Sequence, residues 1–346
     1  MPVTFDKHPL QQHILAISRP GSPPDIARIP AMAVTARGSI LCAWEQRHGG
    51  DWDCCGIALR RSEDGGASWS VPVQIFAAPP GGNANNPVLL VRNDGTVLFL
   101  WCEAYARTFC AVSSDDGLTF RAQTEITAAM AEVRARNGFN WDICATGPGH
   151  GIELRNGVLL VPFWLADSGG ARAHRPSAAG VLRSGDGGES WQNGQLFTAR
   201  GEGFTNPSEA CLAELPNGDI LLNLRHEGNI RRRMTAISHN GGLSFSAPQP
   251  ARALPDPICL GSMAAQPEQE LLAFCNCKSE SARENLTLRF SADGGENWPI
   301  SQKIAALGSY SDLAFSRDGK QLYLFYEHGR YEGLTFESYA LADFGL

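Results

Sequence analysis

Six residues of this chain carry side chains that can hold an anion or move a proton, and each lies near the end of an expected β-strand: Arg28, Asp51, Glu209, Arg225, Arg283 and Tyr310. Arg28 begins the segment Arg-Ile-Pro, which favours an extended backbone. Asp51 lies in the glycine-containing loop 48–52, and Glu209 and Arg225 bracket a hairpin whose turn is Pro216-Asn-Gly. Each residue alone has an ordinary structural explanation, so their significance depends on whether the fold brings them together.

The charge balance of the chain makes its arginines more informative. The 346 residues include 29 Lys and Arg against 36 Asp and Glu, which gives a formal net charge of −7. Binding a phosphate backbone requires a basic face, so a nucleic-acid partner is not expected. An acidic protein that binds an anion must instead concentrate its positive charge locally.

The elements that must position these residues are marked by an eight-residue pattern, Ser-x-Asp/Asn-x-Gly-x-x-Trp/Phe, which occurs five times. The copies start at Ser62, Ser113, Ser184, Ser238 and Ser291, so consecutive starts are 51, 71, 54 and 53 residues apart. The glycines supply the positive φ angles of a tight turn, and the Ser and Asp side chains can bond turn amides. The fourth copy has Asn240 in place of aspartate. We interpret the copies as turns at an outer rim and not as the active site.

A repeat of about 50 residues has the size of a four-stranded propeller blade. The tail from residue 307 to 346 adds further strand patterns, and its segment Ser316-Arg-Asp-Gly is similar to a decayed sixth copy. The strand around residues 40–44 could complete the last blade. We therefore predict an all-β fold, a six-bladed β-propeller of four-stranded antiparallel blades that forms one catalytic domain over residues 1–346. The long second interval predicts an insertion with a short helix at residues 128–137.

The ten cysteines and the first residues bear on the compartment of the protein. Cys54 and Cys55 are adjacent, and Cys275 and Cys277 point to the same face of a strand, so neither pair readily forms a relaxed disulfide. Cys-x-x-Cys pairs with metal-site spacing are absent from the sequence, so no zinc site is expected. The chain has no apolar run of membrane-spanning length and begins without the apolar core of a signal peptide. We expect buried free thiols and a cytoplasmic protein, or a secreted or periplasmic one if a leader has been removed.

Taken together, the candidate residues and their surroundings resemble the sialidases (neuraminidases), bacterial-type exo-α-glycosidases with Asp-box (BNR) repeats. The resemblance rests on Arg28-Ile-Pro before the first repeat, on Ala145-Thr-Gly-Pro-Gly-His-Gly-Ile, on the segment 281–295 and on Tyr310-Ser-Asp-Leu. It extends from Arg28 to Glu327 and implies a six-bladed propeller. No departure from the family pattern falls on a catalytic position.

The resemblance implies how a substrate would be held. Sialic acid carries a carboxylate on its anomeric carbon, and Arg28, Arg225 and Arg283 would bind it, because guanidinium groups match carboxylate geometry and stay charged. Glu327 would buttress the first arginine. A sialylated glycan, or a glycan ending in a related acidic sugar, is therefore the expected partner.

The resemblance also implies the chemistry. Tyr310 would be the nucleophile, because a neutral phenol is not repelled by the substrate carboxylate as a second carboxylate would be. Glu209 would accept the proton of the phenol, and Asp51 would protonate the leaving oxygen and then deprotonate water. Asp53 is the alternative acid. Two displacements retain the anomeric configuration and require no metal or organic cofactor.

Two other functions remain open at this point. A carbohydrate-binding propeller without turnover could keep the arginines, but it would have no use for Asp51, Glu209 and Tyr310 together. A glycosidase for a related nine-carbon acidic sugar, deaminated or a bacterial variant, would use the same arginines and differ at the N-acyl pocket. Linkage preference, hydrolysis against transfer, and oligomeric state do not follow from these residues.

Overall fold

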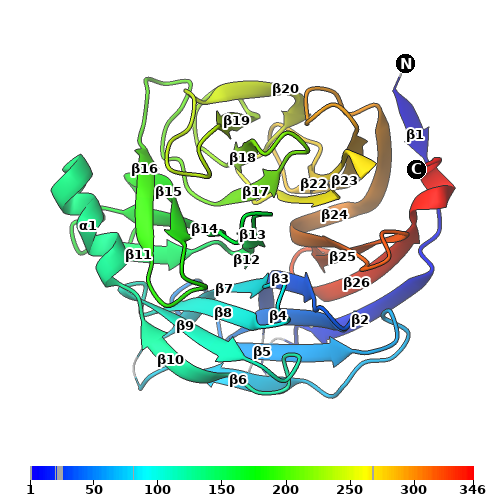
Figure 1. The fold of residues 1–346 in the computed structure, drawn as a ribbon, viewed down its shortest axis with the longest axis horizontal. Helices are drawn as coiled ribbons and strands as arrows, with labels where there is room; N and C mark the ends of the chain where they lie inside the picture. Colours follow the sequence, from blue (N-terminus) through cyan, green and yellow to red (C-terminus); the bar gives the residue numbers. More distant parts are fainter. Residues whose placement is uncertain (1, 20, 22–25, 81, 267–268) are drawn as a thin grey trace.

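β-sheets stand around a central axis in the computed structural model, which describes residues 2–19, 21, 26–80, 82–266 and 269–346 (Figure 1). Within these residues the strands form five hydrogen-bonded sheets, and all pairings inside a sheet are antiparallel except two short ones, β1 with β24 and β12 with β7. Strands β3, β7, β17 and β24 contact strands of neighbouring sheets. These strands therefore face the central axis.

Four of the sheets have four or five strands. The first contains β3 (Ile26–Val34), β4 (Ile40–Arg47), β5 (Cys54–Ser62) and β6 (Val73–Ala77). The second contains β7 (Ala84–Val91), β8 (Val97–Glu103), β9 (Arg107–Ser113), β10 (Arg121–Glu125) and β12 (Gly149–His150). The third contains β11 (Ile143–Thr146), β13 (Ile152–Glu153), β14 (Leu159–Ala166), β15 (Ser177–Ser184) and β16 (Gln192–Phe197). The fourth contains β17 (Ala210–Glu214), β18 (Ile220–Leu224), β19 (Arg232–Ser238) and β20 (Gln249–Pro255).

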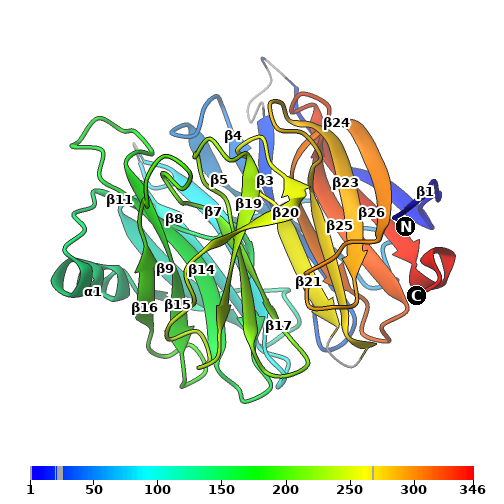
Figure 2. The same cartoon turned by 90° about the horizontal axis from the view of Figure 1, so that it is seen from above.

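The fifth sheet has eight strands. Its members are β1 (Val3–Phe5), β2 (Gln11–Ile17), β21 (Ser262–Gln266), β22 (Leu271–Cys277), β23 (Glu284–Ser291), β24 (Ile300–Phe315), β25 (Gln321–His328) and β26 (Gly333–Ala340). The long strand β24 curves through this sheet, as Figures 1 and 2 show from two directions.

The prediction of six separate four-stranded blades is wrong, because one strand belongs to both of the last two repeats. The first half of β24 pairs with β23, and its second half pairs with β25, with a change of partner at Gly308. The sequence of β24 contains no proline and no Asn-Gly or Asp-Gly turn that would divide it. A Cβ atom at Gly308 would lie 3.1 Å from Cβ of Leu286, so glycine permits the close packing at the bend. The fold is therefore four blade-like sheets and one curved sheet of eight strands.

Two smaller expectations about the ends of the chain are also wrong. Residues 40–44 lie in β4 of the first sheet, and it is β2 that pairs with β26 to complete the eight-stranded sheet. The segment 316–319 joins β24 to β25, whereas the five repeats each follow the third strand of a sheet. Its likeness to the repeats reflects a shared turn chemistry and not an equivalent position.

The five repeats form the turns that their residues predict. In the first, the Ser62 hydroxyl accepts a hydrogen bond from the Gly66 amide at 2.9 Å and donates one to Asp64 at 2.8 Å. In the fourth, Asn240 replaces aspartate and its Oδ1 still accepts from the Ser244 amide at 2.9 Å.

The predicted helix is confirmed as α1 (Ala128–Asn137), which ends at Gly138 with φ of 66°. A 3-10 helix (Leu341–Phe344) follows the last strand.

Apolar side chains fill the spaces between neighbouring sheets. Trp101 of β8 stacks on Phe76 of β6 with ring centroids 3.9 Å apart, and so joins the second sheet to the first.

The eight cysteines whose side chains are described are buried and unbonded to one another, as expected for free thiols, whereas the side chains of Cys54 and Cys55 lie outside the described set. In the described part of the chain, no helix has the length and apolar character needed to cross a membrane.

The repeat turns yield a test of stability. Asp186 accepts hydrogen bonds from the Ser190 amide at 3.0 Å and from the Ser184 hydroxyl at 2.7 Å. We expect Asp186→Ala to lower the free energy of unfolding by about 1 kcal/mol, since surface hydrogen bonds of this kind contribute modestly. Urea unfolding followed by tryptophan fluorescence measures this change.

The chain offers its own control, because Asn240 occupies the equivalent position in the fourth repeat. Asp186→Asn should therefore keep most of the stability. Hydrogen bonds from Ser190 and Ser184 lower the pKa of Asp186 from 3.8 to about 2. Stability from a carboxylate with a lowered folded pKa is present above the unfolded pKa and is lost as the pH falls through the folded value. The difference between the wild type and D186A should thus shrink between pH values of about 4 and about 2; a constant difference would contradict this assignment.

Candidate active site

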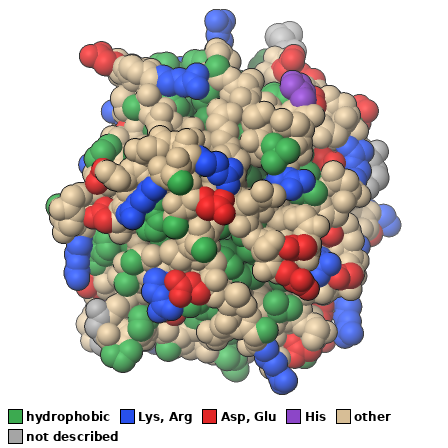
Figure 3. Space-filling view, turned by 60° about the vertical axis from the view of Figure 1, so that its left-hand side comes forward, with side chains coloured by type: hydrophobic (Ala, Val, Ile, Leu, Met, Phe, Trp, Pro, Cys, Tyr) green, Lys and Arg blue, Asp and Glu red, His purple; other side chains and the backbone are tan. Residues whose placement is uncertain are grey.

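A cavity of about 410 Å³ lies where the beginnings of the inner strands meet, and all six candidate residues line it: Arg28, Asp51, Glu209, Arg225, Arg283 and Tyr310. Residues separated by up to 282 positions in the chain therefore share one site. On the face shown in Figure 3, positive and negative side chains are intermixed. An acidic protein that binds an anion was expected to concentrate its positive charge locally, and the arginines that do so line this cavity.

Strand ends and irregularities place these side chains. Arg28 lies where the register of β3 against β4 shifts, next to Ile29, whose φ is +59°. Glu209 immediately precedes β17 and Arg225 immediately follows β18, and the Arg225 amide donates to the Glu209 carbonyl at 2.9 Å. Tyr310 lies within β24, two residues after Gly308. The departures from regular pairing thus occur where functional side chains must turn inward.

A buried carboxylate, Glu327, organises one side of the cavity. It accepts hydrogen bonds from Nε of Arg28 at 2.6 Å, from the Ile29 amide at 2.9 Å and from the Tyr310 amide at 3.2 Å. Burial alone would raise the pKa of Glu327, but Arg28, the Ile29 amide and Arg283 together lower it below its ordinary value. The structure therefore places Glu327 where the resemblance predicts a buttress, bridging β25 to β3 and β24.

Tyr310, Glu209 and Arg225 form a hydrogen-bonded group on the opposite side. The Tyr310 hydroxyl donates to Oε1 of Glu209 at 2.5 Å and accepts from Nη1 of Arg225 at 2.6 Å, and Nη1 also contacts Oε2 of Glu209. Burial raises the pKa of Tyr310 well above 10, although Arg225 and Arg283 act in the opposite direction. The buried phenol therefore keeps its proton, and that proton is directed at Glu209.

The third arginine differs from the other two in its partners. Nη1 of Arg283 donates to the Ser309 hydroxyl at 3.1 Å and to the Tyr331 hydroxyl at 3.0 Å, and both acceptors are neutral. Among the described residues no carboxylate lies within ion-pair distance of Arg283, whereas Arg28 and Arg225 pair with Glu327 and Glu209. The positive charge of Arg283 is therefore available for an external anion.

The comparisons with known proteins agree with this arrangement. Residues 38–324 match the family model described as BNR repeat-like domain. The chain belongs to this family.

The predicted kinship with the sialidases is confirmed by the curated relatives of the chain. It is 28% identical to a sialidase of Bacteroides fragilis over 91% of this chain and 62% of that protein. It is 30% identical to a sialidase of Micromonospora viridifaciens over 92% of this chain and 52% of that protein. The chain thus spans only part of the length of these relatives.

The fold of this BNR-repeat chain is similar to that of solved sialidase structures. The structure of the Hadza microbial sialidase Hz136 superposes with a TM-score of 0.77 at 24% identity, covering 92% of this chain and 66% of that one. At this identity the likeness concerns the fold alone.

Asp51 lies at the cavity mouth in an ion pair. Its Oδ1 is 2.5 Å from Nη1 of Arg47, and its Oδ2 is 3.9 Å from Nδ1 of His174. Burial would raise the pKa of Asp51, but Arg47 lowers it below its ordinary value. Asp53, the alternative acid, does not line the cavity, and its Oδ2 accepts instead from the Gly50 amide at 3.1 Å.

Sequence reasoning missed several residues that line the site, among them Arg47, His174 and Tyr331. Arg47 ends strand β4 as Arg225 follows β18, so a charged residue at a strand end was the signal that could have found it. His174 is surrounded by the rings of Trp52, Tyr105 and Trp164, with centroids 5.6, 5.5 and 5.2 Å away. Its loop carries no recognisable motif.

In the described residues, no three His, Cys, Asp or Glu side chains group as metal ligands.

The burial of Glu327 yields a second prediction. Removing one partner of a buried ion pair leaves the other charge uncompensated, at a cost of about 3 kcal/mol. We expect Glu327→Gln to lower the free energy of unfolding by about that amount, as measured by urea denaturation at neutral pH. The matched control is Glu63→Gln, because Glu63 pairs with Arg61 while its side chain is 73% exposed. That change should cost less than about 1 kcal/mol, and equal losses in the two variants would contradict the role of Glu327.

Proposed function

We propose that this protein is an exo-α-sialidase, a glycoside hydrolase that removes terminal sialic acids from glycoconjugates with retention of configuration. The observation that carries the proposal is the hydrogen-bonded group of Tyr310, Glu209 and Arg225 in a cavity with two further arginines. The names of the curated relatives support the same activity.

Substrate recognition follows from the charges in the cavity. The carboxylate on the anomeric carbon of a sialoside would be bound by Arg28, Arg225 and Arg283, which reach the cavity from three different parts of the fold. Charge-assisted hydrogen bonds from guanidinium groups to a carboxylate are strong and directional. Because Arg283 has only neutral partners among the described residues, it would gain most from the incoming anion.

The first displacement uses the phenol. As the Tyr310 oxygen forms a bond to the anomeric carbon, its proton passes to Glu209, and Arg225 and Arg283 stabilise the developing phenolate charge. The bond to the glycosidic oxygen breaks at the same time, and Asp51 donates a proton to that oxygen. The products of this step are a free aglycone alcohol and a sugar bound to Tyr310.

The second displacement reverses the first. Asp51, now a carboxylate, takes a proton from a water molecule that attacks the anomeric carbon, while Glu209 returns the proton to the departing phenolate. For the first step Asp51 must be protonated, yet Arg47 stabilises its charged form in the free protein. A bound substrate would weaken that preference, since its carboxylate adds negative charge and its aglycone removes water from the loop.

A non-catalytic sugar-binding role is less well supported, because binding an anion gives no reason to bond a buried phenol to a carboxylate. The first experiment compares fluorogenic α-glycosides of N-acetylneuraminic acid and of its deaminated analogue. Release from the first at the higher rate supports a sialidase, preference for the second indicates the related acidic sugar, and release from neither refutes both enzyme hypotheses.

The nucleophile is tested by changing one hydroxyl. Tyr310→Phe should lower kcat by about three orders of magnitude or more, as loss of a nucleophile does elsewhere, while the melting temperature changes little. A 2,3-difluorinated sialyl donor should form a covalent adduct that mass spectrometry locates on Tyr310. The matched control is Tyr331→Phe, which removes another hydroxyl of the same cavity and should raise KM more than it lowers kcat. An adduct on any other residue would overturn the assignment.

The acid is tested through the leaving group. General acid catalysis contributes about 10²–10⁴-fold, and it matters most for a poor leaving group. Asp51→Ala should therefore slow hydrolysis of sialyllactose far more than that of an aryl sialoside with an acidic phenol. Asp53→Ala is the control and should affect neither rate strongly. Equal losses on both substrates in D51A would show that Asp51 acts structurally.

A further inference from the structure

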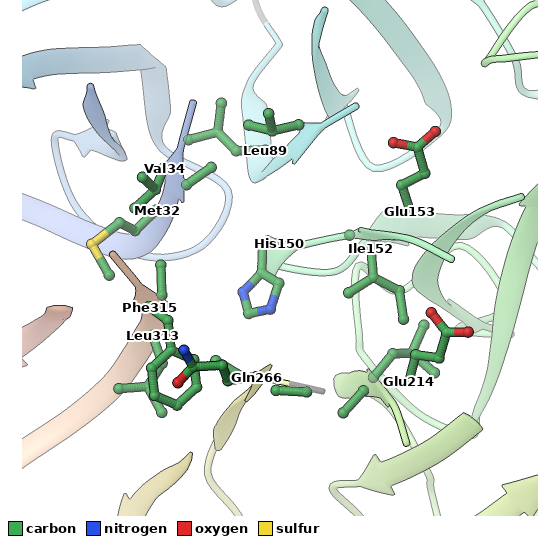
Figure 4. A pocket seen from close by; sticks show the side chains of 18 of the residues that line it. Met32, Val34, Leu89, His150, Ile152, Glu153, Glu214, Gln266, Leu313 and Phe315 are labelled. Atoms are coloured by element: carbon green, nitrogen blue, oxygen red, sulfur yellow. The ribbon is translucent and has the colours of Figure 1, made fainter. Parts of the chain in front are cut away.

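A second cavity, of about 480 Å³, lies at the other end of the inner strands (Figure 4). It is lined by residues that follow the active-site residues along the same strands, such as Met32 four positions after Arg28 and Leu313 three positions after Tyr310. Figure 4 shows the His150 ring projecting into the middle of this cavity. His150 belongs to the segment 145–152 that the sequence singled out, and the proposed reaction does not use it.

His150 lines the second cavity and contacts a buried acidic side chain, Asp312. Nδ1 of His150 lies 2.6 Å from Oδ1 of Asp312, whose side chain is only 1% exposed. Oδ2 of Asp312 accepts from the Met32 amide at 2.8 Å. His150 makes a further hydrogen bond to the backbone of Met263 on β21. The pair therefore connects strands from opposite sides of the central axis.

The glycines around His150 explain how it reaches this position. Gly147 and Gly149 have φ angles of 31° and 112°, which L side chains rarely adopt. A Cβ atom on Gly147 would lie 2.5 Å from Cγ2 of Val88, so the segment packs directly on β7. Short strand β12 then runs parallel to β7 and carries His150 to the axis.

His150 and Asp312 contact each other through Nδ1 and Oδ1, and backbone amides donate to both oxygens of Asp312, that of Met32 to Oδ2 and that of Leu313 to Oδ1. Burial alone would lower the pKa of His150, but the Asp312 carboxylate and the bond to Met263 raise it above its ordinary value. A hydrogen-bonded pair with little exposure to water holds its partners in a narrow range of geometries.

Strand geometry connects this pair to the nucleophile. Tyr310 lines the active-site cavity and Asp312, two residues further along β24, contacts His150, whereas Ser311 between them bonds Ser262 at 2.9 Å. The Met32 amide that bonds Asp312 belongs to the strand that carries Arg28. A shift of this pair would therefore move both β24 and β3 beneath the active site.

We propose that His150 is a positioning residue for the reaction: through Asp312 it fixes β24 against β3, and so keeps the Tyr310 hydroxyl on Glu209 and Arg225. The inference rests on the proposed function. His150 touches no substrate. Its effect is on the geometry of the attack, where a misplacement of about 1 Å costs about 10²-fold in rate.

The test removes the imidazole ring of His150 by mutation and then supplies free imidazole in solution. His150→Ala should lower kcat on an aryl sialoside by about 10- to 100-fold with KM changed by less than about twofold, as expected when reacting atoms are misplaced but binding groups remain. Added imidazole should restore much of kcat, because the second cavity adjoins the vacated space. The matched control is His239→Ala, another His–Asp pair with an Nδ1–Oδ1 distance of 2.7 Å, which lies at the surface and should change neither constant.

A second measurement does not depend on turnover. The protein has six tyrosines, and with 3-fluorotyrosine incorporated, the ¹⁹F signal that disappears in Y310F reports the surroundings of the Tyr310 hydroxyl. This signal should shift in H150A and return toward its original position with imidazole. If wild-type protein releases no sugar, the proposed function fails and the ¹⁹F signal alone decides the role of His150. An unchanged signal in H150A overturns the proposal, as does a loss of kcat that only parallels a loss of folded protein and is not restored by imidazole.

Discussion

Mutual repulsion among guanidinium groups gathered in one cavity is the constraint to which the rest of the structure responds. Like charges that share a cavity with restricted water access repel more strongly than they do in bulk solvent. Carboxylates in ion pairs reduce this repulsion: Glu327 lies beside Arg28, and Glu209 lies beside Arg225. Arg47 is neutralised in the same way by buried Glu45, at 2.5 Å. Among the described residues, Arg283 has only neutral partners, so its charge is available to an incoming anion.

The same constraint explains the double use of Glu209. As a partner of Arg225 it balances charge, and in the proposed reaction it would also receive the proton of Tyr310, from which it accepts a hydrogen bond. Protonation of Glu209 removes its negative charge while the phenolate acquires one, so the total charge around Arg225 stays nearly constant during proton transfer. A site that already holds several cations can therefore form an anionic nucleophile without a large electrostatic penalty.

The sequence contained much of the site but less of the sheet architecture. Arginines and carboxylates at strand ends, together with the resemblance to a known family, were enough to select six residues. The structure shows that all six line one cavity. Arg47 and His174 were missed because one looked like an ordinary strand end and the other lies in a loop without a motif. The repeats mark turns, and a turn says nothing about whether the next strand ends or continues. The only sign in the sequence that β24 is continuous is the lack of a turn-forming pair within its 16 residues.

The pairing of β2 with β26 has a consequence for synthesis of the protein. Residues 11–17 leave the ribosome well before their hydrogen-bonding partner at residues 333–340, which is made more than 300 residues later. Until then the early strand lacks this neighbour and presents an unpaired edge of the kind that favours aggregation. Closure also brings β3, which follows β2 directly, beside Glu327. Assembly of the cavity is thus postponed until residues 333–340 have been translated, and a nascent or truncated chain that lacks Glu327 would carry Arg28 without the carboxylate that balances it.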